Sequence, residues 1–378
     1  MGGSGTLSGA FFAARGREAG EVGVGAVAAD TEAVRLSSNE NPLGPGKKAM
    51  DAILANFDQT GRYPFNSRLL DRHLKDAVAK MYGAKSDNVV LGAGSGEILR
   101  NATRAFTSAS AAVVTAHPSF ATCAETAKQI GSPVKYVELG ATMQIDLDKM
   151  AEAAKGAGLV FFCNPNNPSA TVHGAKAVAD FVTRVRKESP STFILIDEAY
   201  HDYVTDPNYH SAYEIALSTP NVFIARTFSK AYGMAGMRSG YAVGQPETIK
   251  QLARFSMPYN NNVPVVAAAI ASLEDQAHIA EERERNTAAR KFTLDFFKTA
   301  GFKATDSQTN FIFVNLGRPA KEFRDACAQH NVVVGRDFPP LEKTWSRISI
   351  GTMDEMKKAT AVFAKVLGTT TTTSASRP

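Results

Sequence analysis

The sequence contains few of the residues that mark metal sites and disulfide scaffolds. Its 378 residues include only three cysteines (Cys123, Cys163 and Cys327) and one tryptophan. The cysteines are odd in number and show no Cys-x-x-Cys spacing, so the sequence indicates neither a disulfide framework nor a cysteine zinc site. The histidines form no His-Glu-x-x-His motif, so the zinc-protease pattern is absent and no metal site is predicted.

Long apolar runs and a large excess of one charge are also missing. No apolar stretch approaches the ~20 residues that a membrane-spanning helix needs. The net charge is only +5, and basic residues are interleaved with acidic ones, as in residues 281–285, which is typical of a solvated helix face rather than a nucleic-acid surface. We therefore expect neither a membrane nor a nucleic-acid partner. With 44% apolar residues, a chain of 378 residues can bury a large core and form two domains.

The middle of the chain alternates short apolar segments with amphipathic ones. Strands are predicted at residues 88–91, 111–115, 134–137, 159–163, 193–196, 222–225 and 241–243, with helices such as 67–82, 98–106 and 176–187 between them. This alternation predicts an α/β domain with a mostly parallel, seven-stranded sheet. After about residue 246 the pattern turns helical, with a long helix at 275–299. It then returns to strands at 310–314, 332–334 and 348–350, which predicts a smaller C-terminal α+β domain.

Three polar side chains follow successive predicted strands. Asn167 comes after the fourth strand, Asp197 after the fifth and Lys230 after the sixth. Open parallel sheets bind ligands at the carboxyl ends of their strands. We therefore expect the three side chains to lie close together at that edge.

Lys230 follows the hydroxyl residues Thr227 and Ser229, and Arg238 comes eight residues after it. A lysine amine can hold an aldehyde cofactor as a Schiff base, and the hydroxyl groups and guanidinium can hold its phosphate. A buried aspartate such as Asp197 needs a cationic partner, which a protonated pyridine nitrogen provides. Asn167 can donate to the oxygen of the same ring. These residue types together predict a pyridoxal-phosphate site.

A glycine-rich turn at residues 92–97 precedes the helix predicted at 98–106. Its small residues let backbone N–H groups approach a phosphate, although the glycine spacing is neither that of Gly-x-Gly-x-x-Gly nor that of Gly-x-Ser-x-Gly. Taken singly, each motif also fits a structural role. These roles are a tight turn here, a Pro/Asn turn at 164–168, a helix N-cap at Asp197 and a solvated Lys230.

In combination and in this order, the motifs resemble one enzyme family. They are residues 36–45, 62–64, 94–97, 164–168, 197–200, 229–233 and 346–352. From about Leu36 to Leu367 the sequence is similar to the fold-type I pyridoxal-phosphate enzymes called class I and II aminotransferases, and within them to the histidinol-phosphate aminotransferase-like branch.

The resemblance implies a fold like that of aspartate aminotransferase. The expected parts are a mobile N-terminal arm at 1–30, a segment at 31–58 packing with the small domain, a large cofactor-binding domain at 59–270, a small C-terminal domain at 271–367 and a disordered tail at 368–378.

The resemblance also implies a role for individual residues. Lys230, Asp197 and Tyr200 form the catalytic set. The residues expected at the cofactor are Gly94, Ser95, Gly96, Phe120, Asn167, Asp197, Tyr200, Thr227, Ser229, Lys230, Arg238 and Tyr63. Those expected at the substrate are Arg347, Arg336, Asn41, Tyr259 and Asn310. Arg347 would clamp a carboxylate with two hydrogen bonds. Tyr63 would reach the phosphate of the neighbouring subunit, which implies a homodimer with shared active sites.

The implied activity is amino transfer to a 2-oxo acid by a ping-pong aldimine/ketimine mechanism. The donor is an amino acid or an amino-alcohol phosphate, such as histidinol phosphate or an aromatic donor. Departures from the family pattern, such as Gly96 at an aspartate position and Phe120 at a tyrosine position, leave the donor open.

Two other functions stay open, because the motifs do not fix which bond at the substrate breaks. A decarboxylase or lyase on the same scaffold is the alternative, and a non-catalytic cofactor-binding regulator is the third, although no helix-turn-helix is evident. The expected location is cytoplasmic, with export after removal of an N-terminal signal not present in this chain as the alternative.

Overall fold

The computed structural model describes residues 33–64 and 71–369. The N-terminal arm expected at 1–30, the start of the helix expected at 67–82 and nearly all of the tail expected at 368–378 lie outside the described residues. Every helix and strand named below belongs to one compact unit, which begins at Val34.

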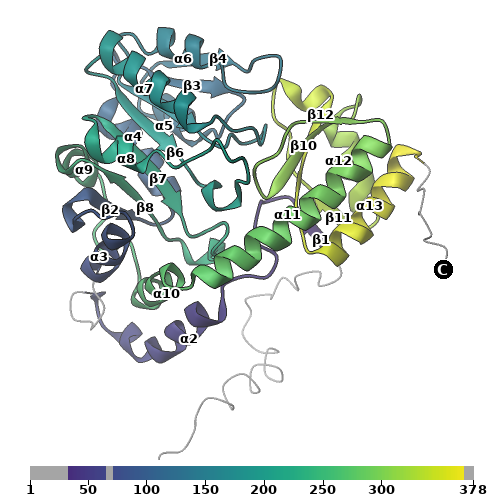
Figure 1. Cartoon of the computed structure of the whole chain (residues 1–378), viewed down its shortest axis with the longest axis horizontal. Helices are drawn as coiled ribbons and strands as arrows, with labels where there is room; N and C mark the ends of the chain where they lie inside the picture. The colour runs from purple at the N-terminus through teal and green to yellow at the C-terminus, as the bar shows by residue number, and fades with distance from the viewer. Residues whose placement is uncertain (1–32, 65–70, 370–378) are drawn as a thin grey trace, which may run out of the picture. The chain divides into compact units, whose positions relative to one another are not determined.

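A seven-stranded sheet lies at the centre of the larger part of this unit (Figure 1). Its strands are β2 (Val89–Gly92), β3 (Val113–His117), β4 (Val134–Glu138), β5 (Leu159–Cys163), β6 (Phe193–Asp197), β7 (Val222–Thr227) and β8 (Gly240–Gly244). Their order is β2-β8-β7-β6-β5-β3-β4, and every pair is parallel except the two that involve β8. The predicted mostly parallel sheet is confirmed. Strand β3 begins two residues later than predicted, after a bridge between Ser108 and Ala111.

Alternate side chains of each central strand pack into two different hydrophobic cores, because successive residues of a strand point to opposite faces. On β5, Val160 and Phe162 join one core, whereas Leu159, Phe161 and Cys163 join the other. The first core includes α3 (Asp71–Met81), α6 (Leu147–Ala153), α7 (Ala175–Glu188), α8 (Tyr213–Ser218) and α10 (Val263–Leu273), and the second includes α4 (Ser95–Phe106), α5 (Thr122–Gln129) and α9 (Pro246–Ala253). Helices on both faces explain why these strands are continuous apolar runs in the sequence.

Two small sheets and three helices form a third hydrophobic core. Strands β9 (Lys303–Ala304), β10 (Phe311–Asn315) and β12 (Trp345–Ser349) form an antiparallel sheet, and β1 (Val34–Leu36) pairs with β11 (Val332–Val334). Helices α11 (Gln276–Thr299), α12 (Ala320–Ala328) and α13 (Met353–Leu367) pack against them. Strand β12 begins three residues earlier in the sequence than the predicted strand 348–350, because its pairing with β10 already starts at Trp345.

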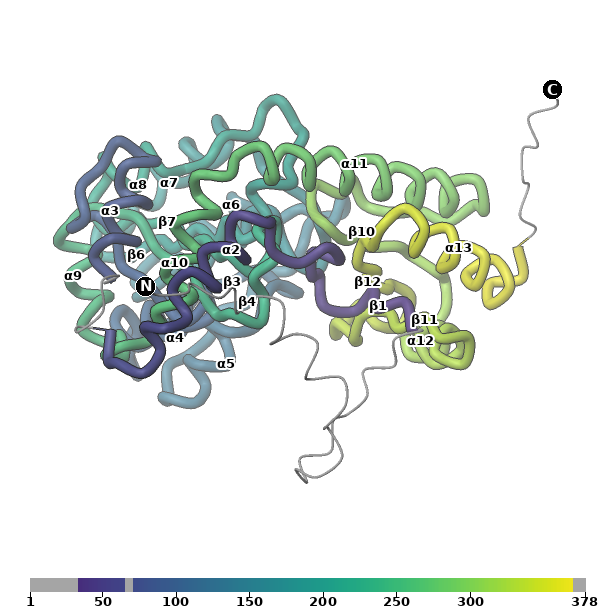
Figure 2. Tube along the Cα trace, turned by 90° about the horizontal axis from the view of Figure 1, so that it is seen from below, coloured from purple at the N-terminus to yellow at the C-terminus, as the bar shows by residue number. Residues whose placement is uncertain are grey.

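The segment between β1 and α3 connects the two groups of sheets. The sequence predicts that residues 31–58 pack with the smaller domain, and β1 does so through β11. Helix α2 (Lys47–Ala55) instead lies beside α10, and Ala49 joins the core of the large sheet (Figure 2). The predicted domain boundaries themselves stay a prediction.

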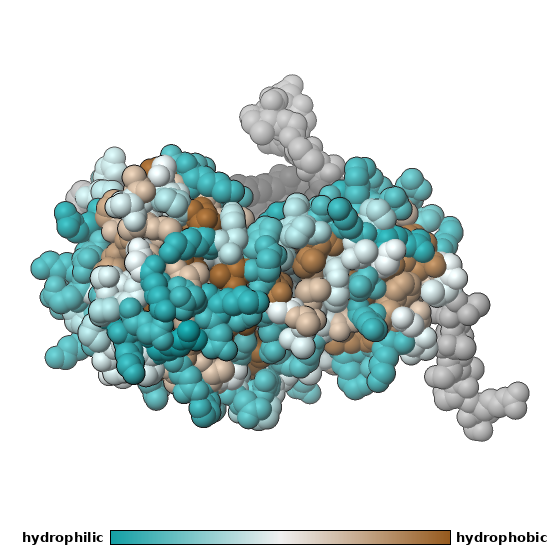
Figure 3. Space-filling view, turned by 90° about the horizontal axis from the view of Figure 1, so that it is seen from above, coloured by the Kyte–Doolittle hydropathy of each residue, from teal (hydrophilic) through white to brown (hydrophobic). Residues whose placement is uncertain are grey.

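The described residues lack several features that the sequence also lacks. No helix within residues 33–64 and 71–369 is both long and apolar enough to cross a bilayer. Over the same ranges, no three His, Cys, Asp or Glu side chains are grouped so that they could hold a metal ion, and the three cysteines are free and buried. The face drawn in Figure 3 is mostly hydrophilic, with smaller hydrophobic patches.

Candidate active site

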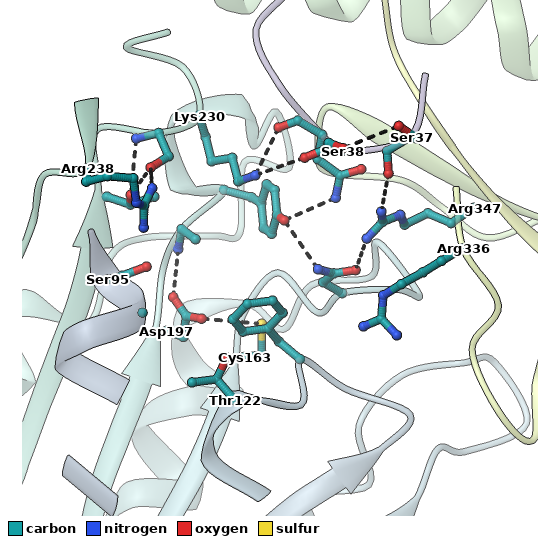
Figure 4. A pocket seen from close by; sticks show the side chains of 18 of the residues that line it. Ser37, Ser38, Ser95, Thr122, Cys163, Asp197, Lys230, Arg238, Arg336 and Arg347 are labelled. Carbon is teal, nitrogen blue, oxygen red and sulfur yellow. Dashed lines mark hydrogen bonds between the residues drawn. The ribbon is translucent and has the colours of Figure 1, made fainter. Parts of the chain in front are cut away.

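A pocket of about 420 Å³ lies at the carboxyl ends of the central parallel strands (Figure 4). Twelve residues predicted for the site line it, namely Ser95, Gly96, Phe120, Asn167, Asp197, Tyr200, Thr227, Ser229, Lys230, Arg238, Arg336 and Arg347. Seven lining residues were not predicted, namely Ser37, Ser38, Asn39, Arg100, Thr122, Cys163 and Ala199. The pocket therefore combines residues of the large sheet, of the small sheets and of the segment that connects them.

The sheet topology brings together the three polar side chains that follow successive strands. Strands β5, β6 and β7 are direct neighbours, and Asp197, the last residue of β6, lies opposite Cys163 on β5 and Ala225 on β7. Asn167 follows β5 and Lys230 follows β7, so both lie at the same edge. The prediction that these side chains meet is confirmed. It required only that strands successive in the sequence lie side by side in the sheet.

Asp197 is a buried carboxylate that forms no ion pair within the described part of the chain, although the charge of Lys230 acts on it from a longer distance. The residue is only 2% exposed, and its Oδ1 accepts a hydrogen bond of 3.2 Å from the backbone N–H of Ala199. The thiol of Cys163 lies 4.0 Å from Oδ2. Burial raises the pKa of Asp197 from 3.8 to about 7. A protonated ring nitrogen at this position would supply the missing positive charge.

Lys230 points into the pocket from the turn that follows β7. Its Nζ donates to the backbone oxygens of Asn39, at 3.0 Å, and Ser38, at 3.3 Å, and lies 5.5 Å from the centre of the Tyr200 ring. Burial lowers the pKa of Lys230 to about 8, and the positive charge of Arg347 adds to the effect. The neutral amine, which a nucleophile or a general base requires, is therefore far more populated near neutral pH than in an ordinary lysine.

A group of N–H and hydroxyl donors lies where helix α4 begins. Gly94 precedes the helix with φ of +75°, and a side chain there would collide with the guanidinium of Arg238. Arg238 donates from Nη1 to the hydroxyl of Ser229, at 3.1 Å, and Thr227 donates to the same oxygen, at 2.9 Å. Together with the helix N-terminus at Ser95, these groups can hold a phosphate dianion.

Two arginines come from the small sheets and the loop after β11. Arg347 on β12 is 6% exposed and donates to the Asn167 side chain at 2.8 Å and to the backbone oxygen of Ser37 at 2.6 Å. Burial, opposed by Tyr200 and assisted by nearby Arg336, lowers the pKa of Arg347 to about 10. Both guanidiniums lie over the Phe338 ring, at 4.8 and 4.6 Å from its centre. This pair forms a positively charged wall of the pocket.

The comparisons with known proteins agree with this arrangement. The profile of the family described as "Aminotransferase class I and II" matches residues 31–363. A histidinol-phosphate aminotransferase of Moorella thermoacetica is 36% identical over 323 residues, which cover 85% of this chain and 82% of that protein. The chain belongs to the class I and II aminotransferases.

Solved structures place this aminotransferase within the family's fold. The histidinol-phosphate aminotransferase of Sinorhizobium meliloti, solved with pyridoxal-5'-phosphate, superposes with a TM-score of 0.81 at 28% identity over 89% of this chain and 91% of that one. An aspartate aminotransferase of Thermotoga maritima has a TM-score of 0.79 at 18% identity over 89% and 92% of the two chains, which shows the fold. The predicted aspartate aminotransferase-like fold, enzyme class and pyridoxal-phosphate cofactor are thus confirmed.

Five predicted residues do not line the pocket of this aminotransferase. Gly94 lies behind it, in contact range of Arg238. Asn41 donates to the backbone oxygen of Ala231 at 3.0 Å, and Asn310 donates to that of Asn39 at 3.0 Å. Tyr63 and Tyr259 are exposed, and their ring centres are 6.1 Å apart. Their roles stay predictions.

The unpredicted lining residues carried weaker sequence signals. Ser37, Ser38 and Asn39 belong to the motif at 36–45, but nothing in the sequence says that this segment returns to the sheet edge. Cys163 is the last residue of β5, so its place in the strand could have revealed it. Arg100 is one helical turn after Gly96 and donates to its backbone oxygen at 3.2 Å.

Proposed function

We propose that this aminotransferase takes an amino-alcohol phosphate of the histidinol phosphate type as its donor and a 2-oxo acid as its acceptor. The name of the Moorella relative supports this donor. The observation that carries the proposal is the pair of guanidiniums at Phe338, because two fixed cations suit a phosphate dianion better than a single carboxylate.

Arg336 is the more informative member of this pair. Its neighbour Asp337 is bound by Arg324, and no ion pair involves Arg336 among the residues that the structure describes. A cation that lines the pocket and has no anionic partner there is available for a substrate anion. Arg347 then binds the same phosphate in one half-reaction and the carboxylate of the 2-oxo acid in the other.

A second cavity next to Phe120 and Arg336 offers room for the donor's ring. It measures about 190 Å³, and the side chains of His117, Tyr136 and Phe338 line it. A cavity of ~150 Å³ is large enough to admit benzene. An imidazole or phenyl ring therefore fits, which supports a ring-bearing donor over a small aliphatic one.

The roles of the chain's own groups follow from their surroundings. Pyridoxal phosphate, when bound, supplies the electron sink and carries the amino group between the two substrates. Asp197 would hold the ring nitrogen in its protonated form, and the ring of Phe120 would stack on the cofactor. Tyr200 and Asn167 would hold the ring oxygen.

Proton movement falls to Lys230. Its free amine would act as the general base that takes the proton from the substrate carbon, and then as the general acid that gives it back. Its lowered pKa makes the neutral base far more populated near neutral pH than it is in an ordinary lysine. The donors around Ser229 and Arg238 would hold the phosphate.

We also propose that the protein works as a homodimer in which Tyr63 completes the partner's site. Tyr63 and Tyr259 are exposed close to one another, and Leu54, Phe57 and Met257 expose apolar side chains in neighbouring segments. Large apolar side chains that are exposed close together commonly mark an interface between proteins. Light scattering after size exclusion should give twice the 40.4 kDa chain mass. A monomer at working concentration would refute this part. The cytoplasmic location stays a prediction.

The donor is tested by adding single amino compounds to the cofactor-loaded protein without any oxo acid. We expect histidinol phosphate to remove the visible absorbance band of the lysine-bound cofactor, and Arg336→Met to weaken this reaction more than the reaction with glutamate. Release of carbon dioxide with the band retained would favour the decarboxylase alternative. If phenylalanine reacts and histidinol phosphate does not, the phosphate assignment is wrong while the aminotransferase class stands.

A further inference from the structure

The segment 37–41 crosses the pocket between β1 and α2 and contacts both sets of sheets. The backbone oxygen of Ser37 accepts a hydrogen bond from Arg347, and that of Ser38 accepts one from Lys230, as Figure 4 shows. These contacts connect the expected substrate arginine and the expected catalytic lysine to one short stretch of chain. Asn39, the next residue, makes more of these contacts than either serine.

Asn39 is held by both its backbone and its side chain. It is 1% exposed and has φ of +54°, in the left-handed region. The hydroxyl of Ser349, on β12, accepts from the backbone N–H of Asn39 at 2.9 Å and donates to its Oδ1 at 2.8 Å. The backbone oxygen of Asn39 accepts from Lys230 and from Asn310, both at 3.0 Å. Its position is therefore defined independently of its remaining group, the side-chain N–H.

That remaining group donates to Tyr200. The distance from Nδ2 of Asn39 to the Tyr200 hydroxyl oxygen is 3.1 Å, and Nδ2 of Asn167 also donates to this oxygen, at 3.4 Å. A phenol hydroxyl has one hydrogen to donate and accepts through its lone pairs. Since amide N–H groups occupy the accepting side, the hydroxyl hydrogen of Tyr200 is left to donate elsewhere in the pocket.

We propose that Asn39 is a positioning residue that directs the hydroxyl hydrogen of Tyr200 toward the ring oxygen of the cofactor. This inference rests on the proposed placement of the cofactor ring beside Tyr200. Donation from Asn39 withdraws charge from the phenol oxygen, which makes its O–H a stronger donor. A stronger donor at the ring oxygen stabilises negative charge on the ring. It therefore lowers the pH at which the bound cofactor loses its proton.

Other charged and titratable groups also face Tyr200. They are Lys230, Arg347, Asp197 and Cys163. Burial raises the pKa of Tyr200, whereas Arg347 and the hydrogen bond from Asn39 lower it. Substitution of Asn39 leaves all four of these groups in place, so a change in the pH behaviour of the cofactor reports on the amide.

The test variant is Asn39→Gly, because glycine adopts a positive φ without strain. It keeps the backbone groups that contact Lys230 and Ser349 and removes only the amide. Ser349→Ala is a graded companion variant, since it keeps the amide of Asn39 but removes the hydroxyl that holds its Oδ1. Tyr200→Phe and the double variant Asn39→Gly/Tyr200→Phe complete a double-mutant cycle.

The measurement is the pH midpoint of the visible absorbance change of the bound cofactor, together with the dissociation constant of the cofactor. We expect Asn39→Gly to raise the midpoint by about 0.5 to 1 unit, the size of one hydrogen bond's contribution. Ser349→Ala keeps the amide donor, so it should raise the midpoint by less than Asn39→Gly does. In the Tyr200→Phe background, Asn39→Gly should produce no further shift.

Two outcomes would overturn the proposal. If Asn39→Gly lowers stability or cofactor affinity but leaves the midpoint unchanged, Asn39 only tethers the segment. If the shift persists without the Tyr200 hydroxyl, Asn39 acts on the cofactor by another route. A wild-type protein without any visible band would instead refute the proposed function, so the two failures are distinguishable.

Discussion

Replacing Asp197 by asparagine should have opposite effects on stability and on cofactor binding. Without cofactor, burial raises the pKa of this carboxyl from 3.8 to about 7. The unfolded chain loses the proton at the lower value, so between these two values the native state binds more protons than the unfolded state. The free energy of unfolding therefore falls as the pH rises through this window, and the penalty is complete above about pH 7.

The magnitude follows from the width of this window. About three pH units at about 1.36 kcal/mol each give a penalty of about 4 kcal/mol at most. Asparagine cannot ionise, so Asp197→Asn should stabilise the cofactor-free protein at about pH 8 by up to this amount, and by less at about pH 5. Removing one partner of a buried charge pair should at the same time weaken cofactor binding by ~100-fold or more.

The assay is chemical unfolding of the cofactor-free protein followed by circular dichroism, alongside a titration with pyridoxal phosphate. Asp180→Asn, at an exposed carboxylate paired with Lys176, is the control and should change stability by less than about 1 kcal/mol. If Asp197→Asn is less stable than the wild type at about pH 8, the carboxylate is already compensated and the argument for a cationic cofactor at this position fails.

Three further predictions concern the neighbouring groups. The rate at which the cofactor-free protein incorporates pyridoxal phosphate should rise with pH through about 8, because only neutral Lys230 reacts with an aldehyde. If the rate instead rises with a pH midpoint near the ordinary pKa of lysine, this prediction is wrong. In the wild type, Nη2 of buried Arg226 lies 2.9 Å from Oε2 of Glu198. Glu198→Gln removes this anionic partner and should lower the free energy of unfolding by ~3–5 kcal/mol. A loss below 1 kcal/mol in chemical unfolding would refute the burial argument. Arg347→Lys should lower kcat/KM for the oxo acid by ~10- to 100-fold, because an ammonium cannot make two parallel hydrogen bonds. The visible spectrum of the bound cofactor should be the same in the variant and in the wild type. If the two proteins are equally active with the oxo acid, Arg347 does not form a bidentate clamp.

The sequence determined the strands and the residues that follow them. Apolar runs such as β5 and β6 are recognisable because both faces of these strands are buried, so every position is apolar. Asp197 stands out for the same reason, since a carboxylate that ends such a run needs a cation. The expectation that successive parallel strands lie side by side was enough to predict that Asn167, Asp197 and Lys230 share an edge. The full order β2-β8-β7-β6-β5-β3-β4 was not predicted.

The segments that lie opposite that edge are known only from the folded chain. Asn39 and Ser349 are 310 residues apart, and no local pattern states that they are hydrogen-bonded. The pairing of Asp337 with Arg324 left Arg336 for the pocket, which the sequence could not distinguish from an Arg336–Asp337 pair. Local periodicity reports which face of an element is buried. It does not report which distant segment covers that face, because many segments of similar polarity could do so.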